Sequence, residues 1–283
     1  MDKQTLRRLL FGEFTFKRLV RSIIFIYACF CLYVFFFADG KIFLPQPSSY
    51  QDTSEILKLT TADQIQLSAV YLPNPASTYT IVYTHGNAED LGDIRPVLQQ
   101  LRDIGFSVFA YDYRGYGTSQ GTPSERNAYR DIDTAYNYLT QQLRVPPQRI
   151  IAYGRSVGGG SAVDLASRKP LAGLIMESCF TSAFRVVVPI PILPFDKFRN
   201  IGKIKKVKCP VLVMHGKADE VIPFSHGQQL FAAAFEPKRY LWVDEAGHND
   251  FIWAAGDRYA KTLHEFAQLI QHPTSRGQWV GNP

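Results

Sequence analysis

Cysteine is scarce in this sequence, and the pairings that cysteine chemistry needs are absent. The 283 residues include four cysteines, at positions 29, 31, 179 and 209, and no C-x-x-C pair. This density is far below that of a disulfide-stapled scaffold, and no spacing is typical of a zinc or redox site. We therefore expect no metal site. Internal repeats are also lacking, and the 46% hydrophobic content excludes a disordered chain.

Excess positive charge is lacking over most of the chain, although the net charge is +6. Residues 1–21 hold six Lys and Arg against Asp2 and Glu13 and so carry +4, whereas the rest of the chain carries only +2. A basic surface that could bind nucleic acid would need its charges on the folded domain. We expect no nucleic-acid partner, and we treat residues 1–21 as a basic N-terminal segment.

Residues 22–38 contain no charge and are rich in Phe, Ile and Tyr. As a helix they would be about 26 Å long, which barely spans a bilayer core. We expect an uncleaved transmembrane signal anchor, because the residues after it offer no small-x-small cleavage site. Cations are concentrated before the span, which predicts a single-pass protein with a cytoplasmic N-terminus and the domain that follows the span outside the cytoplasm. The alternative is a buried helix or a helix lying in the membrane plane, either of which would allow the domain to stay in the cytosol.

Residues 39–51 are rich in Pro and Ser and indicate a linker, after which strand and helix patterns alternate. The first two strands adjoin and suggest a hairpin, while the others alternate with helices and suggest a mostly parallel, eight-stranded α/β sheet with helices on both faces. We place this domain at residues 52–273 and a C-terminal tail at 274–283. The expected strands are 56–60, 65–72, 80–84, 107–111, 149–153, 173–177, 211–215 and 239–243, and the expected helices are 91–104, 124–143, 156–167, 225–235 and 258–271.

The pentapeptide Gly154–Gly158, with sequence GRSVG, directly follows an expected strand and opens an expected helix. A nucleophile elbow has this context, because its serine lies on a strained strand-to-helix turn that needs glycine on both sides. The motif predicts Ser156 as a nucleophile. The alternative is a Gly-rich and Ser-rich turn without chemistry.

A serine nucleophile needs a histidine base, and the base needs a carboxylate that orients it. In this type of fold the carboxylate and then the histidine follow the serine along the chain. Asp219 follows the strand 211–215, and His248 follows the strand 239–243. Taken singly, each is more commonly a turn aspartate or a solvated loop histidine, but together they predict a Ser156–His248–Asp219 catalytic triad.

The loop after the strand 80–84 reads Thr84-His85-Gly86-Asn87. This fold takes one oxyanion amide from that loop and the other from the residue after the nucleophile. We therefore assign the oxyanion hole to the backbone N–H groups of Asn87 and Val157. His85 and His215 are interpreted as structural.

Together, several motifs resemble the α/β-hydrolase superfamily, and more closely the group of protein depalmitoylases and their membrane-anchored relatives. The motifs are His85–Gly92 (HGNAEDLG), Tyr111–Ser119 (YDYRGYGTS), Pro123–Asn127 (PSERN), Gly154–Gly158 (GRSVG) and Gly247–Asp250 (GHND). The resemblance implies the α/β-hydrolase fold, the triad named above, an acyl-enzyme mechanism and no cofactor. It departs from the depalmitoylases at the N-terminus, where this chain has a basic segment and an apolar span instead of a cysteine-rich one.

Residues 178–208 form an insertion large enough for a short cap, with an uncharged stretch at 186–195 followed by a cationic run. We assign Val186, Ile190 and Ile192 to substrate binding, as an acyl-chain site or a membrane-facing lip. The alternative is an ordinary loop packed on the core.

These patterns predict a serine hydrolase that cleaves carboxylic esters or thioesters of acyl or lipid-like substrates, including acylated proteins. The fold and the triad do not choose between ester, thioester and amide. A serine peptidase and an acyltransferase therefore remain alternatives, as does a catalytically silent, membrane-anchored binding module.

Overall fold

The computed structural model describes residues 15–272, so most of the expected basic segment 1–21 and the whole expected tail 274–283 lie outside the described residues. The chain divides into two compact units, one ending at Lys41 and one beginning at Ile42.

The first unit is a long helix, α2, which runs from Phe16 to Phe37. It begins earlier than the apolar run because the Thr15 hydroxyl accepts a hydrogen bond from the Arg18 amide (3.3 Å) and so caps the helix. Its 22 residues correspond to about 33 Å, close to the thickness of a bilayer core. By length and composition, α2 is able to cross a membrane. A short helix, α3 (Asp39–Ile42), follows it.

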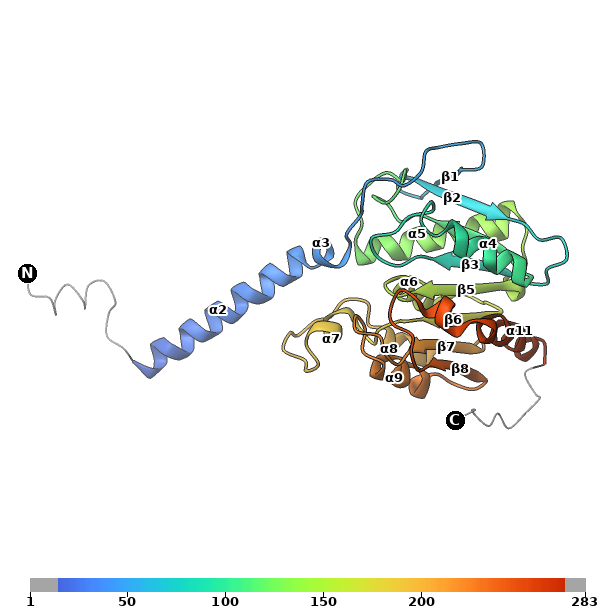
Figure 1. Ribbon diagram of the computed structural model, residues 1–283. Helices are drawn as coiled ribbons and strands as arrows, with labels where there is room; N and C mark the ends of the chain where they lie inside the picture. Colours follow the sequence, from blue (N-terminus) through green and yellow to red (C-terminus); the bar gives the residue numbers. More distant parts are fainter. Residues whose placement is uncertain (1–14, 273–283) are drawn as a thin grey trace, which may run out of the picture. The chain divides into compact units, whose positions relative to one another are not determined.

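The second unit is built on one eight-stranded sheet with the strand order β1-β2-β4-β3-β5-β6-β7-β8 (Figure 1). β1 and β2 form the expected antiparallel hairpin, β2 pairs antiparallel with β4, and all other neighbours are parallel. The strands are β1 (Leu57–Thr60), β2 (Gln66–Leu72), β3 (Thr80–Thr84), β4 (Ser107–Tyr111), β5 (Ile150–Arg155), β6 (Gly173–Glu177), β7 (Val211–Gly216) and β8 (Lys238–Val243).

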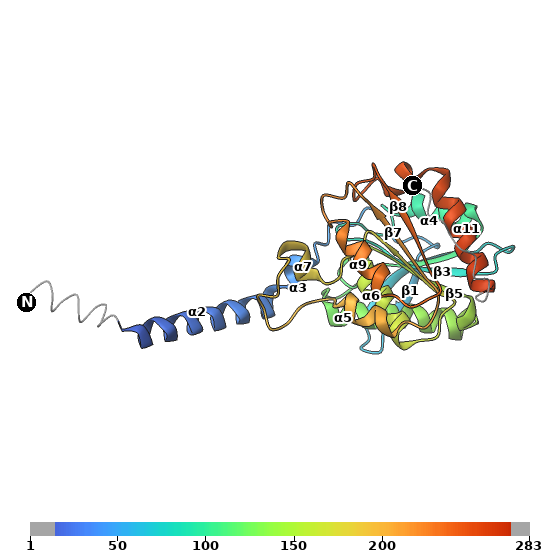
Figure 2. The ribbon, with the colours of Figure 1, turned by 90° about the horizontal axis from the view of Figure 1, so that it is seen from below.

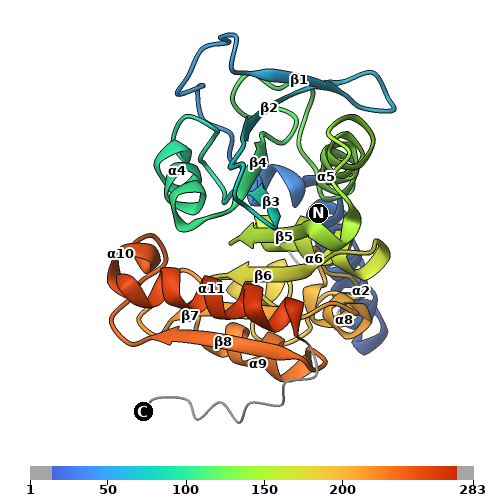
Figure 3. The same ribbon diagram turned by 90° about the vertical axis from the view of Figure 1, so that its right-hand side faces the viewer.

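Helices cover both faces of the sheet. Figures 2 and 3 show α4, α10 and α11 on one face and α5, α6 and α8 on the other. The helices are α4 (Arg95–Ile104), α5 (Glu125–Asn137), α6 (Gly158–Arg168), α7 (Ala183–Val187), α8 (Asn200–Lys203), α9 (Ser225–Ala233), α10 (Phe251–Ala255) and α11 (Asp257–Gln271), with a π-helical turn at Tyr138–Gln142 and 3₁₀ turns at Pro147–Arg149 and Ile204–Lys206. The architecture is that of the α/β-hydrolase fold, as expected.

Two hydrophobic cores form, one on each face of the sheet. All five residues of β3 are buried, and they alternate between the cores: Val82 packs into the core beneath α5 and α6, while Ile81 packs into the core beneath α4 and α11. Neither face of a parallel strand that helices cover on both sides contacts solvent, so its side chains can be apolar on both faces. This explains why these strands read as continuous apolar runs.

The parallel register brings the carboxyl ends of the strands to one edge of the sheet. Gly154 near the end of β5 pairs with Met176, and Gly216 at the end of β7 pairs with Val243 at the end of β8. The loops that follow β5, β7 and β8 therefore leave the sheet at this edge, and they carry Ser156, Asp219 and His248.

The segment before β1 is bonded to the domain. The Ser49 amide donates to Asp90 (2.8 Å), and the Tyr50 hydroxyl donates to Asp112 (2.6 Å). Residues 39–51 are expected from sequence to be a linker, but from Ile42 onward the chain belongs to the second unit. Polar side chains on the loops after β3 and β4 hold it there, which composition alone does not reveal.

Candidate active site

Ser156 lies between β5 and α6 in a strained backbone conformation. Its φ angle is +52°, in the left-handed region that non-glycine residues rarely adopt. The Ser156 amide donates to the Glu177 carbonyl (2.9 Å), which ties the turn to the end of β6. A left-handed serine held on a strand-to-helix turn is the geometry of a nucleophile elbow.

The glycines on either side of this serine are required by close backbone contacts. A Cβ on Gly154 would lie 2.5 Å from the Gly159 Cα, and a Cβ on Gly158 would overlap the carbonyl oxygen of Thr84. Both contacts are with main-chain atoms, which cannot move aside as a flexible side chain does. The GRSVG spacing thus has a steric cause, and the start of α6 abuts the loop that follows β3.

The three residues predicted as a triad are joined by hydrogen-bond distances. His248 Nε2 lies 3.0 Å from Ser156 Oγ, and His248 Nδ1 lies 2.8 Å from Asp219 Oδ2. All three residues are buried. The arrangement connects a hydroxyl, an imidazole and a carboxylate in the order that serine hydrolases use.

Asp219 is held as a carboxylate. Its Oδ1 accepts from the amides of Val221 (3.0 Å) and Ile222 (2.8 Å). Burial acts to raise the pKa of Asp219, but hydrogen bonds from His215, His248 and the Ile222 amide outweigh it and hold that pKa well below its usual range. A negative charge therefore faces the imidazole of His248 at neutral pH.

The two amides assigned to an oxyanion hole flank the elbow. Val157 follows the serine directly, and Asn87 lies in the loop after β3, which the start of α6 contacts through Gly158. Within residues 15–272, neither the Asn87 nor the Val157 backbone N–H donates to another protein group. Both donors are thus available to a developing oxyanion.

Arg155, the residue before the serine, connects the loops of the site. Its guanidinium contacts both carboxylate oxygens of Glu89 (2.7 Å each), the His248 carbonyl (3.3 Å) and Asn249 Oδ1 (2.9 Å). Glu89 also accepts a hydrogen bond from the Gly86 amide (2.5 Å). One partly buried side chain therefore joins the turn at Ser156, the loop after β3 and the loop that carries His248.

Sequence reasoning assigns no role to Arg155 or Glu89. Both lie inside motifs that carry the resemblance, GRSVG and HGNAEDLG. Their position in these motifs was the one sequence feature that could have pointed to a role at the site. The contact between them joins positions far apart in the sequence, so only the fold reveals it.

His85 and His215, which the sequence indicates are structural, are fully buried. Each ring lies at hydrogen-bond distance from a backbone carbonyl oxygen. His85 Nδ1 lies 2.8 Å from the Gly86 carbonyl, and His215 Nε2 lies 2.9 Å from the Ile222 carbonyl. His215 also approaches Asp219 Oδ2 at 3.4 Å. These contacts hold the two histidine rings against the loops that carry Asn87 and Asp219.

The residues assigned to substrate binding lie in the segment Ala183–Asp196, which includes α7. Val186 is half-buried against the core, whereas the Ile190 and Ile192 side chains are 63% and 42% exposed. Asp196 anchors the base of the segment by accepting from the Ser182 hydroxyl (2.7 Å) and the Phe184 amide (2.9 Å). The structure thus presents Ile190 and Ile192 on an open apolar surface and does not join them to the triad by a described contact.

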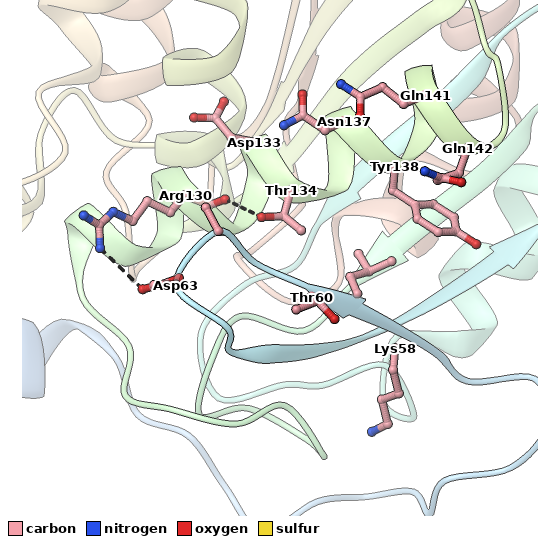
Figure 4. Close-up of a pocket in the computed structure, with 12 residues that line it drawn as sticks. Lys58, Thr60, Asp63, Arg130, Asp133, Thr134, Asn137, Tyr138, Gln141 and Gln142 are labelled. Carbon is pink, nitrogen blue, oxygen red and sulfur yellow. Dashed lines mark hydrogen bonds and ion pairs between the residues drawn. The ribbon is translucent and has the colours of Figure 1, made fainter.

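A separate groove of about 770 Å³ lies between β1 and α5 (Figure 4). Most of the residues that line it are polar or charged, and Arg130 forms an ion pair with Asp63 at one end. No triad residue lines it. Among residues 15–272 there is no cluster of three or more His, Cys, Asp or Glu able to hold a metal ion.

Comparison with known sequences reveals close relatives. The family described as "Serine aminopeptidase, S33" matches residues 75–195. The chain is 42% identical over 225 residues to alpha/beta hydrolase domain-containing protein 17C of Mus musculus, covering 78% of this chain and 69% of the relative. The Homo sapiens 17C protein is also 42% identical over 225 residues, covering 78% of this chain and 67% of the relative.

Comparison with solved structures supports the same fold at lower sequence identity. A Pyrococcus furiosus esterase superposes with a TM-score of 0.68 at 20% identity, covering 82% of this chain and 98% of the esterase. A Pyrococcus horikoshii acylaminoacyl peptidase gives a TM-score of 0.61 at 15% identity, covering 79% of this chain and 42% of the peptidase.

Proposed function

Since this chain belongs to the family of the alpha/beta hydrolase domain-containing 17 proteins and is a hydrolase, we propose that it is a serine hydrolase cleaving carboxylic ester or thioester bonds. The observation that carries the proposal is the continuous path from Ser156 Oγ through the His248 ring to Asp219. The substrates that we propose are acyl or lipid-like esters and thioesters, including acylated proteins.

The reaction would proceed in two steps. In the first, His248 Nε2 accepts the Ser156 hydroxyl proton as Oγ bonds to the substrate carbonyl carbon, and the same proton then passes to the departing alcohol or thiol. In the second, water gives a proton to His248 and attacks the acyl-enzyme, and the carboxylic acid leaves as Ser156 regains its proton. Asp219 stabilises the imidazolium in both steps without being protonated.

Negative charge would develop on the carbonyl oxygen in each tetrahedral intermediate. The Asn87 and Val157 amides are the donors proposed for this charge, and the N-terminus of α6 adds a favourable dipole. Arg155 would act as a positioning residue, because it touches Glu89 and the His248 carbonyl rather than reacting atoms.

The exposed apolar side chains of Ile190 and Ile192 support an acyl-chain or membrane-facing role for this segment. A substrate with a hydrocarbon chain would cover surface that water otherwise contacts. We therefore propose that Val186, Ile190 and Ile192 contribute to substrate binding.

A peptidase is the second candidate, favoured by the description of the family that matches residues 75–195. The same triad can cleave amides. Turnover of matched ester, thioester and aminoacyl amide substrates decides between the two candidates, since a peptidase would retain substantial amide turnover.

We further propose that α2 crosses the membrane once, with the N-terminus in the cytoplasm and the catalytic domain outside it. The support is the length of α2 and the excess of cations before the apolar run. A reporter that is active only outside the cytoplasm, fused after Pro283, is expected to be active. Activity of a cytosolic reporter at the same position would contradict this orientation.

The central experiment is labelling of the full-length chain with a fluorophosphonate probe, compared between the wild type and Ser156→Ala. Because the probe bonds to an activated serine, the wild type should label and the mutant should not, and esterase turnover should fall by several orders of magnitude. Failure of the wild type to label would favour a silent binding module. A labelled mutant would disprove the nucleophile assignment.

A further inference from the structure

The chain enters the catalytic unit through three residues, Ile42–Leu44, that pack against the loops of the candidate site. We call these three residues the strap. Phe43 at its centre is 3% exposed, and its ring packs edge-on against Tyr113, Tyr116 and Phe198 at centroid distances of 6.2, 6.4 and 5.8 Å. A buried aromatic anchor of this kind fixes the position of the backbone on either side of it.

The backbone on both sides of Phe43 is bonded to one side chain, that of Asn87. Asn87 Nδ2 donates to the Ile42 carbonyl (2.7 Å), and the Leu44 amide donates to Asn87 Oδ1 (2.9 Å). The Tyr116 hydroxyl donates to the same Oδ1 (2.6 Å) and lies 3.0 Å from the Leu44 amide nitrogen. The side-chain amide of Asn87 is therefore held on both its donor and its acceptor atoms.

The loop that carries Asn87 needs such support. The next residue, Ala88, has φ of +58°, a left-handed conformation that is strained for an alanine and that persists only where the surroundings impose it. Arg155 and Glu89 hold one side of this loop, and the strap holds Asn87. Without the strap, the side chain of Asn87 would keep only its bonds to Tyr116 and to the neighbouring Ala88 amide.

We propose that the strap is a positioning element of the active site, which fixes the backbone N–H of Asn87 toward the oxyanion. This inference rests on the proposed serine-hydrolase function. It makes the segment between α2 and the first strand part of the catalytic apparatus, rather than a passive connection. Only residues 38–41 separate the last residue of α2 from the strap. A very short stretch of chain therefore connects α2 to the residues that bind Asn87.

The test uses the full-length protein in detergent with a short-chain p-nitrophenyl ester, which does not depend on an acyl-chain site. Asn87→Ala keeps the backbone N–H but removes both bonds to the strap. Tyr116→Phe removes only the hydroxyl shared with the strap. The matched control is Tyr136→Phe on α5, away from these loops, which removes a tyrosine hydroxyl that donates to the Pro170 carbonyl.

Misplacing an oxyanion donor weakens a contact made mainly in the transition state, so kcat should fall with KM unchanged. We expect a loss of about 10- to 100-fold for Asn87→Ala and a smaller loss for Tyr116→Phe. Tyr136→Phe should keep the wild-type kcat. Hydrogen–deuterium exchange at the Leu44 amide should quicken in Asn87→Ala, which a purely catalytic defect would not cause.

Wild-type kcat in both Asn87→Ala and Tyr116→Phe would overturn the proposal. Equal losses in Tyr116→Phe and Tyr136→Phe would also overturn it, because they would indicate general destabilisation. Phe43→Ala is a stronger release of the strap, and if it does not fold, the two milder variants still decide. Ser156→Ala, measured in parallel, distinguishes failure of the proposed function from failure of the strap proposal. If Ser156→Ala retains activity, the proposed function is wrong. If Ser156→Ala is inactive while the strap variants keep wild-type kcat, only the role of the strap is wrong.

Discussion

Ser156 is buried, left-handed and bonded through its amide to β6, whereas Val187 and Ile190 in the segment Ala183–Asp196 are 82% and 63% exposed. A Cβ on either of the glycines around the serine would collide with backbone atoms of β3 or α6, so the turn requires glycine at both positions. The exposed segment is fixed at its base by Asp196, while its apolar tip faces solvent.

This difference in burial suggests different tasks for the turn around Ser156 and for the exposed segment. The turn around Ser156 holds groups that must lie within hydrogen-bond reach of one another, and dense packing supplies that precision. The exposed segment carries hydrophobic surface whose burial would accompany binding of a substrate or a membrane. We therefore expect the chemistry to take place at the turn around Ser156 and the selectivity to depend on the exposed segment.

The largest effect should come from Asp219→Asn, a change of one atom in the rigid region. The variant would keep the shape of the side chain but lose the charge that stabilises the imidazolium and selects its tautomer. Loss of kcat should be on the order of 10³- to 10⁴-fold, measured on a short-chain ester at pH 7. Because the pKa of Asp219 is held below its usual range, the wild-type residue stays ionised down to mildly acidic pH, and this deficit should persist from pH 6 to 8. A loss that disappeared at one end of that range would contradict the role of the carboxylate.

A smaller effect is expected from Arg155, which joins the loops without touching the reacting atoms. Arg155→Lys keeps a positive charge near Glu89, but a single ammonium cannot also reach the His248 carbonyl and Asn249. A displacement of His248 by about 1 Å would cost about 100-fold, so we expect kcat to fall about 10- to 100-fold with KM little changed. Arg168→Lys, which alters a half-exposed arginine bonded to Asp164 and Asp133 on the helices, is the control. Equal kcat values in the two variants would show that Arg155 only supports the fold.

The exposed region should respond to the substrate rather than to the chemistry. Ile190→Asp is expected to reduce turnover of long-chain esters several-fold more than that of acetate esters, since each buried methylene contributes up to ~0.8 kcal/mol. Phe235→Asp places the same charge on a similarly exposed apolar side chain just before β8, and it should affect both substrates alike. If Ile190→Asp lowered both activities equally, the segment would have no acyl-binding role and the proposed division between the regions would fail.

The same contrast explains what the sequence could predict. All eight strands fall within two residues of their expected ends. The central parallel strands are the clearest, because they are buried on both faces and read as apolar runs between helices. The placement of Ser156, Asp219 and His248 on loops at one sheet edge followed from the order of those strands. Their catalytic roles remain proposals, but their juxtaposition was implicit in the topology.

Other features depended on contacts between distant residues. The pairing of Arg155 with Glu89 and the bonds from Asn87 to the strap link segments that no local pattern connects. The Pro and Ser content at residues 45–49 suggests a free linker, yet Ser49 is bonded to Asp90. Such contacts are set by the folded geometry, so composition and periodicity cannot reveal them.

The smallest effect is expected from truncation of Ile190, and the same truncation of a buried isoleucine provides the comparison. Ile190→Ala removes the same atoms as Ile175→Ala, but Ile190 is 63% exposed and Ile175 on β6 is fully buried. Truncation of Ile175 should cost roughly 2–5 kcal/mol of unfolding free energy, because it leaves a cavity between packed side chains. Truncation of Ile190 should change that free energy by less than about 0.5 kcal/mol, because little of its surface is removed from water on folding. Urea denaturation of both full-length variants in detergent provides the comparison. A cost for Ile190 approaching that for Ile175 would mean that the segment packs against another surface under these conditions, and the contrast between the two regions would no longer hold.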